Sequence, residues 1–299
     1  MKMIKKQVSH VFDWWLVHDR LFEFAYASYA ELGCTSFGLP NTHMLRFAEE
    51  PDFADKLKKL NRDYHMHFDG AHAHWSEIWD PNTVGEENRR MMMKNLTMAI
   101  EKTAEFEAGV LTIHPGYSAL QKNSGVTVLE LRQNCIRTME ELLPLAEKRN
   151  VKIALENNIS PADTIDELIA IVEAVNSPYV GVCYDSGHAH EMSKLPGKNA
   201  ADIDGFTQEL WKNNVILGEN NAVDRLAPYI IECHLHDNDG LFDQHRLPGE
   251  GTIDWVHVID VLKNKCPRLE CVQNEAPPCS SKASIPHAVE VFRKLWEER

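Results

Sequence analysis

The amino-acid sequence predicts a single α/β domain, a (β/α)8 barrel that spans residues 1–299. Short runs rich in β-branched and aromatic residues alternate with longer segments of helical periodicity, and this alternation recurs along the whole chain. No linker-like or low-complexity segment interrupts it. The length of 299 residues suits one barrel, and a hydrophobic fraction of 43% is sufficient for a large core. We therefore expect one closed domain.

Eight short runs are predicted to be strands. Their alternation with helical segments is typical of parallel βα units. In chain order, the expected strands are Lys6–Phe12, Thr35–Leu39, Tyr64–Phe68, Val110–His114, Lys152–Glu156, Val180–Asp185, Ile230–His236 and Glu270–Glu275.

The segments between the expected strands have helical spacing and little glycine. Ser160 and Pro161 precede the fifth of them, and Pro286 lies near the start of the last, as is typical of helix N-termini. The expected helices are Asp19–Leu32, Asp52–Leu60, Glu86–Glu107, Val126–Arg149, Asp163–Val175, a pair within Ala200–Ala227, Ile253–Asn264 and Ile285–Glu298.

An open doubly wound sheet is the alternative fold, because it also alternates strands and helices. Such a sheet rarely needs eight units and usually has a glycine-rich phosphate-binding turn after its first strand. Here that position reads FDWWLVHD, and neither GxGxxG nor GxxxxGKS/T occurs in the chain. The barrel is therefore preferred.

The composition limits the partners and the location that we expect. A formal net charge of −14 repels phosphate backbones, and nucleic-acid binding depends on Lys and Arg, so no nucleic-acid partner is expected. No apolar run approaches the roughly 20 residues of a membrane helix, and the N-terminal segment lacks the pattern of a signal peptide. The seven cysteines form no CxxC pair. We expect a cytoplasmic protein with reduced thiols and no membrane contact.

Polar residues end six consecutive expected strands, from the third to the eighth. The C-terminal ends of barrel strands converge on one pocket, where catalytic groups lie. A single His or Glu at a strand end is usually structural, but six ends in succession favour a functional site. The residues are His67, Asp69, His72 and His74 in HFDGAHAH, His114 in LTIHPG, Glu156 in ALENN, Asp185 and His188 in CYDSGH, His234 and His236 in CHLHD, and Glu275 in QNEAP.

These residue types in one pocket indicate a divalent cation. Several carboxylates close together would repel one another and raise each other's pKa values unless a cation neutralised them. Carboxylate oxygens and imidazole nitrogens, without a plausible cysteine ligand, suit Mn²⁺, Mg²⁺, Co²⁺, Fe²⁺ or Zn²⁺. We expect one such ion, with manganese favoured and a second ion as a further option.

Six motifs in chain order carry a resemblance to a known family. They are LTIHPG, ALENN, CYDSGHA, HLHDNDG, DQHRLPGEGTIDW and VQNEAP, and the similarity extends from about His67 to Glu275. As an ordered set they resemble the xylose isomerase-like TIM barrel superfamily, which contains sugar-phosphate isomerases and epimerases and also endonuclease IV. The resemblance implies a barrel enzyme with a metal at the C-terminal ends of its strands.

The ketose epimerases of that superfamily imply roles for four residues. In them, one metal is held by Glu, Asp, His and Glu from strands five to eight, which match Glu156, Asp185, His234 and Glu275 here. The two glutamates also serve as catalytic acid and base. The resemblance thus predicts a divalent-metal-dependent isomerase or epimerase of a small sugar or sugar phosphate, in which the metal stabilises an enediolate. His236 shares a strand face with His234 and is expected to orient a ligand through its ring N–H.

Endonuclease IV implies further candidates, because it holds additional zinc ions and several residues match its pattern. His67 and His72 compete with His74 for the role of its first ligand, and spacing does not separate the three. The candidates for a second metal or for substrate binding are His72, His74, His114, His188, Asp243 and His245.

Three residues are expected to contact the substrate, namely His188, Arg246 and Trp15. Ketose 3-epimerases would place a substrate-binding arginine just before the PGEG turn, whereas this chain has His245 there and Arg246 one place later. Trp15 belongs to an aromatic group that either walls the pocket or packs in the core. The backbone amides of LPGEGTIDW either hold a sugar phosphate or only close the loop.

Two alternative functions stay open at this point. The first is an endonuclease IV-like zinc phosphodiesterase acting on abasic DNA, which the charge of −14 disfavours. The second is a non-catalytic sugar-binding barrel, which the presence of both Glu156 and Glu275 disfavours. The expected partner is a small-molecule sugar or sugar phosphate, and a homo-oligomer is a further option because many relatives form dimers or tetramers.

Overall fold

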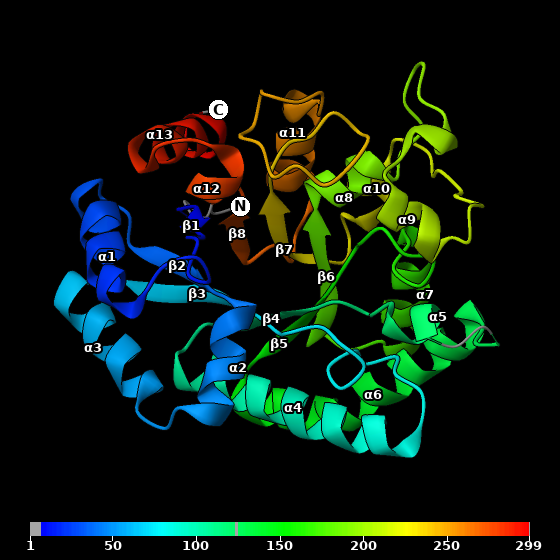
Figure 1. Ribbon diagram of the computed structural model, residues 1–299, viewed down its shortest axis with the longest axis horizontal. Helices are drawn as coiled ribbons and strands as arrows, with labels where there is room; N and C mark the ends of the chain where they lie inside the picture. The colour runs from blue at the N-terminus through cyan, green and yellow to red at the C-terminus, as the bar shows by residue number, and fades with distance from the viewer. Residues whose placement is uncertain (1–6, 123–124, 299) are drawn as a thin grey trace.

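Eight parallel strands close into a barrel in the structure, a computed structural model that describes residues 7–122 and 125–298. The strands follow one another in chain order around the barrel, and β1 pairs with both β2 and β8 (Figure 1). The predicted (β/α)8 barrel is thus confirmed. The strands are β1 Ser9–His10, β2 Ser36–Leu39, β3 His67–His72, β4 Val110–Ile113, β5 Lys152–Glu156, β6 Val180–Asp185, β7 Ile230–Leu235 and β8 Cys271–Asn274.

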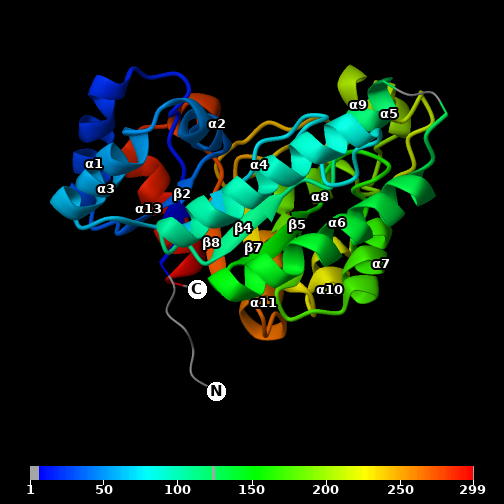
Figure 2. The same cartoon turned by 90° about the horizontal axis from the view of Figure 1, so that it is seen from below.

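Helices connect the strands and surround the barrel. Figure 2 shows α2, α5 and α9 along one side of the molecule and α10 and α11 along the opposite side. No described helix combines the length and the hydrophobicity that a bilayer-spanning segment requires. The helices are α1 Phe22–Glu31, α2 Asn41–Glu49, α3 Phe53–Tyr64, α4 Glu86–Glu105, α5 Ser118–Lys122, α6 Val128–Arg149, α7 Ile165–Val175, α8 Ser186–Glu191, α9 Gly205–Leu210, α10 Ala222–Leu226, α11 Trp255–Lys265, α12 Pro278–Ser281 and α13 Ile285–Trp296.

The long helices begin at side chains that cap their first turns. The Thr127 hydroxyl oxygen accepts a hydrogen bond from the Glu130 amide (3.2 Å) at the start of α6. Thr164 accepts one from the Glu167 amide (3.4 Å) at the start of α7. Each of these bonds satisfies an amide that the helix itself leaves without a partner, which fixes where the helix starts.

Four short helices are not predicted by the sequence, namely α2, α5, α8 and α12. Each follows a strand, after β2, β4, β6 and β8 respectively, and contains or follows Pro, Gly or Ser residues that are typical of loops. Helix α8 begins directly at the end of β6, and the Asp185 carboxylate caps it by accepting the His188 amide hydrogen bond (2.6 Å). These helices therefore lie in the loops at the C-terminal ends of the strands.

Two predicted strands differ from the observed ones by more than one residue at an end. The sequence predicts Lys6–Phe12 as the first strand, but only Ser9–His10 form β1, and Lys6 lies outside the described residues. The sequence predicts the third strand over Tyr64–Phe68, but α3 continues to Tyr64 and β3 runs four residues further than expected. Glycine is typical of turns, but Gly70 lies inside β3. A glycine is needed there because a Cβ would approach Glu232 Oε1 to 2.4 Å.

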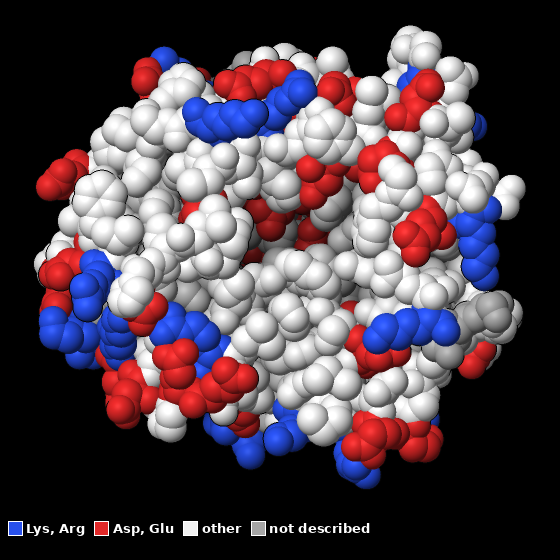
Figure 3. Space-filling model, viewed as in Figure 1, with Lys and Arg blue, Asp and Glu red and all other residues white. Residues whose placement is uncertain are grey.

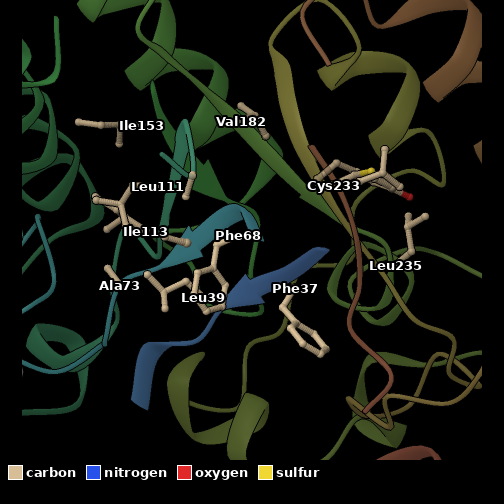
Figure 4. Packing of buried hydrophobic residues seen from close by; sticks show 14 of the residues in the cluster. Phe37, Leu39, Phe68, Ala73, Leu111, Ile113, Ile153, Val182, Cys233 and Leu235 are labelled. Carbon is tan, nitrogen blue, oxygen red and sulfur yellow. The ribbon is translucent and has the colours of Figure 1, made fainter. Parts of the chain in front are cut away.

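Apolar side chains fill the space between the strands and the helices. Ala154 and Cys183 belong to a separate small cluster with Val110, Ile231 and Cys271. Because side chains alternate along a strand, Ala154 and Cys183 face the barrel interior together with the residues two places later, at the strand ends. Residues of the outer cluster include Phe37, Leu39, Phe68, Ala73, Leu111, Ile113, Ile153, Val182, Cys233 and Leu235 (Figure 4).

The variant Gly70→Ala is expected to lower the melting temperature. The added methyl group would lie 2.4 Å from Glu232 Oε1 and 3.1 Å from Cys271 Sγ. Overpacking of this kind typically costs about 1–3 kcal/mol of unfolding free energy. Gly205→Ala is the matched control, because nothing lies within 4 Å of a Cβ at that residue. Differential scanning calorimetry measures both variants, and equal melting temperatures would contradict the close packing at Gly70.

Candidate metal centre

Four strand ends bring Glu156, Asp185, His234 and Glu275 together. Glu156 and Asp185 are the last residues of β5 and β6, His234 lies in β7, and Glu275 directly follows β8. Each side chain offers one possible ligand atom, and the four atoms all lie within 4.8 Å of one another. His234 Nδ1 lies 3.2 Å from Glu275 Oε2 and 3.5 Å from Glu156 Oε1. The structure thus gathers the four residues that the resemblance assigns to one metal.

The donor set fits a divalent metal ion. Glu156, Asp185 and His234 are each at most 1% exposed, so water does not compensate their charges. His234 Nδ1 is buried between two carboxylates and makes no hydrogen bond in the described part of the chain. Carboxylates this close repel one another, and a mixture of carboxylate oxygen and imidazole nitrogen suits ions such as Mn²⁺, Co²⁺ or Zn²⁺. The buried cluster therefore supports a divalent metal at this position.

The imidazoles around Glu156 affect its protonation. Burial alone would raise the pKa of Glu156, but the charges of His234 and His114 outweigh it and hold the pKa well below its usual range. Burial would likewise lower the pKa of His234, yet Cys183 and Glu275 raise it well above its usual value. Glu156 is therefore ionised at neutral pH and able to accept a proton or to bind a cation.

His236 supports the Asp185 carboxylate. Its Nε2 lies 3.0 Å from Asp185 Oδ2 and 3.1 Å from Oδ1, and the ring is fully buried. The ring fits there because Gly187 has no side chain, since a Cβ at Gly187 would lie 1.9 Å from His236 Cε1. The contact agrees with the expectation that His236 orients a ligand, and it fixes which direction Asp185 faces.

His72 is the histidine of the third strand that faces the site. Its Nε2 lies 3.0 Å from Glu156 Oε2, and His114 Nε2 lies 3.2 Å from the same oxygen. His67, at the other end of β3, is paired with Asp69. His74, the third of the open alternatives, is not among the described residues that line the cavity, and its ring stacks on Trp75. Because β3 extends to His72, that residue lies at the C-terminal end of the strand, beside Glu156.

A second group of possible ligands lies beside the first. Atoms of His236, Asp243 and His245 lie within 4.8 Å of one another, and His188 Nε2 lies 3.6 Å from Asp243 Oδ2. His245 Nε2 is 2.8 Å from the same carboxylate oxygen. Burial opposes protonation of His245, but the Asp243 charge raises its pKa to about 10. Of the candidates for a second metal, Asp243 and His245 form this group with His236, and His188 lies next to it, whereas His72 and His114 lie beside Glu156.

Arg246 is not among the residues that line the cavity, in contrast to the expectation that it contacts substrate. Its backbone pairs with Asp237 in an isolated antiparallel bridge, and its guanidinium lies 3.3 Å from Asp239 Oδ2. The bridge turns its side chain away, and His245 lines the cavity instead. Trp15 and His188 do line the cavity, as expected, and Trp15 is 49% exposed there.

The amides of LPGEGTIDW mostly bond to the protein itself. Asp237 Oδ2 accepts hydrogen bonds from the Gly249 amide and the Trp255 indole, both at 2.8 Å. The Thr252 amide donates to the Asn238 carbonyl oxygen at 2.9 Å. Gly251 is required for this closure, because a Cβ there would lie 2.2 Å from the Asn238 carbonyl oxygen. Of the two interpretations of this segment, the structure favours the one in which it closes the loop.

Glu191 is a cavity residue that the sequence analysis did not identify. It lies in α8, one turn after His188, and its carboxyl lines the cavity although the residue is fully buried. One oxygen accepts a hydrogen bond from Thr207 at 2.8 Å, and Oε2 has no partner in the described chain. Burial raises the pKa of Glu191 to about 8, so the carboxyl can donate a hydrogen bond at neutral pH. Glu191 shares a helix face with His188, and the sequence would have indicated this only if α8 had been recognised as a helix.

Two buried aspartates hold the loops after β3, β4 and β5. Asp80 accepts hydrogen bonds from the amides of Ser76 (3.0 Å) and Ser118 (3.1 Å). Asp163 accepts one from the Ser160 hydroxyl at 2.7 Å. Gly116, with φ of 109°, packs against Asp80 where a Cβ would clash at 2.3 Å. This network fixes the turn directly after His114.

Glu156 and Glu275 line one large cavity of about 760 Å³, and ligand atoms of the buried Asp185 and His234 lie within 4.8 Å of theirs. Figure 3 shows this hollow in the centre of the face, with acidic side chains visible inside it. The fold and the site together define a (β/α)8 barrel with a candidate metal centre at the C-terminal ends of β5 to β8. Residues 26–295 match the family described as Xylose isomerase-like TIM barrel, and the chain belongs to that family.

Several relatives have similar sequences. Uncharacterized protein MJ1311 of Methanocaldococcus jannaschii is 30% identical over 201 residues, which cover 64% of this chain and 59% of the relative. Probable endonuclease 4 of Mesomycoplasma hyopneumoniae is 27% identical over 53% of this chain and 52% of its own. Inosose isomerase of Halalkalibacterium halodurans is 27% identical over 46% and 43%. The matched region thus spans less than two thirds of each relative.

Solved structures share the fold over most of the chain. A D-tagatose 3-epimerase-like protein is 24% identical with a TM-score of 0.64, covering 88% of both chains. The IOLI protein with a binding zinc atom is 20% identical with a TM-score of 0.67, covering 93% of this chain and 91% of its own. The 3-keto-D-glucoside 4-epimerase YcjR of E. coli is 15% identical with a TM-score of 0.64, covering 97% and 98%. These likenesses support the barrel.

The variant His234→Asn is expected to weaken binding of a divalent metal at least about tenfold, since even residues that only support a ligand contribute that much. His257→Asn is the matched control, because His257 lies on α11 and pairs with Asp224 at 2.6 Å, outside the cavity. Isothermal titration with Mn²⁺ and Zn²⁺, together with metal analysis of the dialysed protein, measures the difference. Equal affinity in both variants would contradict the assignment of His234.

The variant Asp163→Asn is expected to flatten the pH dependence of stability. Burial raises the pKa of Asp163 from 3.8 to about 7, and the Asp80 charge adds to this effect. Between about pH 4 and pH 7 the unfolded chain loses a proton that the folded chain keeps, so the unfolding free energy falls by up to about 1.4 kcal/mol per pH unit. Urea unfolding from pH 4.5 to 7.5 compares the variant with the parent. Parallel curves would contradict the elevated pKa.

Proposed function

We propose that the protein is a divalent-metal-dependent isomerase or epimerase that moves a proton next to the carbonyl group of a sugar. The observation that carries the proposal is the gathering of ligand atoms of Glu156, Asp185, His234 and Glu275 within 4.8 Å of one another, with Glu156 and Glu275 lining a large cavity. The names of relatives and structural neighbours support it, since they include an inosose isomerase and a D-tagatose 3-epimerase-like protein.

The four gathered residues would hold the metal. When bound, a divalent ion polarises a carbonyl oxygen and stabilises the negative charge that develops in an enediolate. Because Glu156 and Glu275 border the same space, a sugar carbon placed between them would have a carboxylate within reach on each side. This arrangement suits the transfer of a proton off and onto carbon.

Glu156 and Glu275 would act as base and acid. Burial would raise the pKa of Glu275, but the His234 charge holds it below its usual range, so both carboxylates begin as bases. His72 and His114 contact Oε2 of Glu156, whereas His234 lies near Oε1. These contacts keep the carboxylate in place. Removal of the proton by one glutamate and its return by either one gives an isomer or an epimer. His188 and Glu191 line the cavity and would contact substrate hydroxyl groups.

The metal-loaded protein is expected to exchange the proton next to the carbonyl of a ketose with solvent deuterium. Glu156→Gln and Glu275→Gln would lower this rate by roughly 10²–10⁴-fold, because an amide does not accept the proton. Glu270→Gln is the matched control, since Glu270 directly precedes β8 at the other end of the barrel and pairs with Lys152. NMR in D₂O measures the exchange. No exchange with any ketose at saturating metal would contradict the proposal.

A zinc phosphodiesterase acting on abasic DNA is the second candidate. The group formed by His236, Asp243 and His245 favours it, because it provides ligands for a further metal. The name of the Mesomycoplasma relative also supports it. Against it are the net charge of −14 and a cavity without Lys or Arg among its described lining residues. Incision of an abasic duplex by the zinc-loaded protein would reverse the preference.

A further inference from the structure

The cavity is larger than a single sugar ring requires. Cavities of about 300–1,000 Å³ typically hold drug-sized ligands, whereas a hexose has only about 12 non-hydrogen atoms. The volume here is about 760 Å³. A monosaccharide that reached the carboxylates on the floor would therefore leave most of the outer cavity filled with water.

The outer part of the cavity has an aromatic wall. Five Trp and Phe side chains are exposed in the described chain, and four of them line this cavity, namely Trp15 (49% exposed), Trp75 (37%), Phe206 (41%) and Phe242 (47%). They come from four separate segments, after β1, after β3, in α9 and after β7. Exposed aromatic groups that collect at one cavity from separate segments indicate a binding surface for an apolar group.

The cavity has no Lys or Arg among its described lining residues to bind a phosphate. Asp204 adds an acidic side chain to the wall. The loop segment with the Gly249, Thr252 and Ile253 amides donates to Asp237 and Asn238 instead of to a ligand. In Figure 3 the Lys and Arg side chains of this face lie away from the hollow. His188 and His245, which also line the cavity, are paired with Asp243 at 3.6 and 2.8 Å, so a phosphate would compete with that carboxylate for them.

From the size, the aromatic wall and the absence of Lys and Arg from the described lining, we propose that the substrate is a neutral, unphosphorylated glycoside with an aromatic aglycone and a ketone on its sugar ring. This inference rests on the proposed function, because the ketone is needed for proton transfer by the glutamates. In a glycoside the anomeric carbon is blocked, so the carbonyl group has to lie on another ring carbon. The sugar ring binds at the floor near Glu275, and the aglycone packs between Phe206 and Phe242.

Three matched probes test the substrate class. They are 4-nitrophenyl 3-keto-β-D-glucopyranoside, free 3-keto-D-glucose and fructose 6-phosphate. With the Mn²⁺-loaded protein in D₂O, the aryl compound is expected to have a KM for proton exchange at least about tenfold lower than the free keto sugar, since its aromatic ring is buried against the wall. The phosphate is expected to be the poorest probe. Equal KM values for the first two, or preference for the phosphate, would overturn the inference.

Variants of the wall provide the second arm. Phe206→Ala and Phe242→Ala are expected to raise KM for the aryl compound at least about fivefold, and by more than for the free keto sugar. Phe24→Ala is the matched control, because Phe24 is 61% exposed on α1 and does not line this cavity. The same increase for both compounds in the wall variants would contradict packing of an aglycone there.

A binding measurement separates this inference from the reaction. 4-Nitrophenyl β-D-glucopyranoside has no ketone, and its binding is expected to quench the fluorescence of Trp15 and Trp75. Quenching that Phe242→Ala weakens, without proton exchange from any keto probe, would contradict the proposed reaction and support the aromatic site. Exchange from the free keto sugar alone, without quenching, would support the reaction and overturn the aromatic site.

Discussion

Crowding of negative charge at the C-terminal ends of β5 to β8 is the constraint on which the rest of the site depends. Glu156, Asp185 and Glu275 offer oxygens that lie within 4.8 Å of one another, and two of these residues are almost wholly buried. Little water is present to screen them, so compensation has to come from the protein or from a cation. His234 lies among the three carboxylates, and His72, His114 and other imidazoles surround them.

The packing around the centre follows from this constraint. Polar side chains approach one another closely around the centre, and glycine residues provide the space for them. Gly187 admits the His236 ring next to Asp185, and Gly70 admits the Glu232 carboxylate inside the barrel below the centre. Below these polar groups, small apolar side chains such as Ala154 and Cys183 fill the interior. The candidate ligands thus lie at the C-terminal ends of the strands, whereas the Glu232 carboxylate inside the barrel accepts a hydrogen bond from Thr112 at 2.6 Å.

Much of the fold and of the centre could be predicted from the sequence, because both depend on local pattern. The ends of β5 and β6 agree with prediction since Glu156 and Asp185 interrupt apolar runs. Which of His67, His72 and His74 faces the site could not be predicted, because the course of β3 includes the packing of Gly70 against a residue 162 positions away in the chain. The positions of Arg246 and Glu191 also could not be predicted. The first depends on an isolated bridge and the second on a short helix, and neither leaves a periodic pattern in the sequence.

One carboxylate closes the long loop after β7 at its base. Asp237 joins the Gly249 amide, the Trp255 indole and the backbone of Arg246, so the chain leaves and re-enters the barrel at a fixed point. The tip between these two points brings Phe242, Asp243 and His245 to the cavity. Descendants of this protein could therefore diverge in what they recognise by altering the tip, while β7 and α11 keep their assembly.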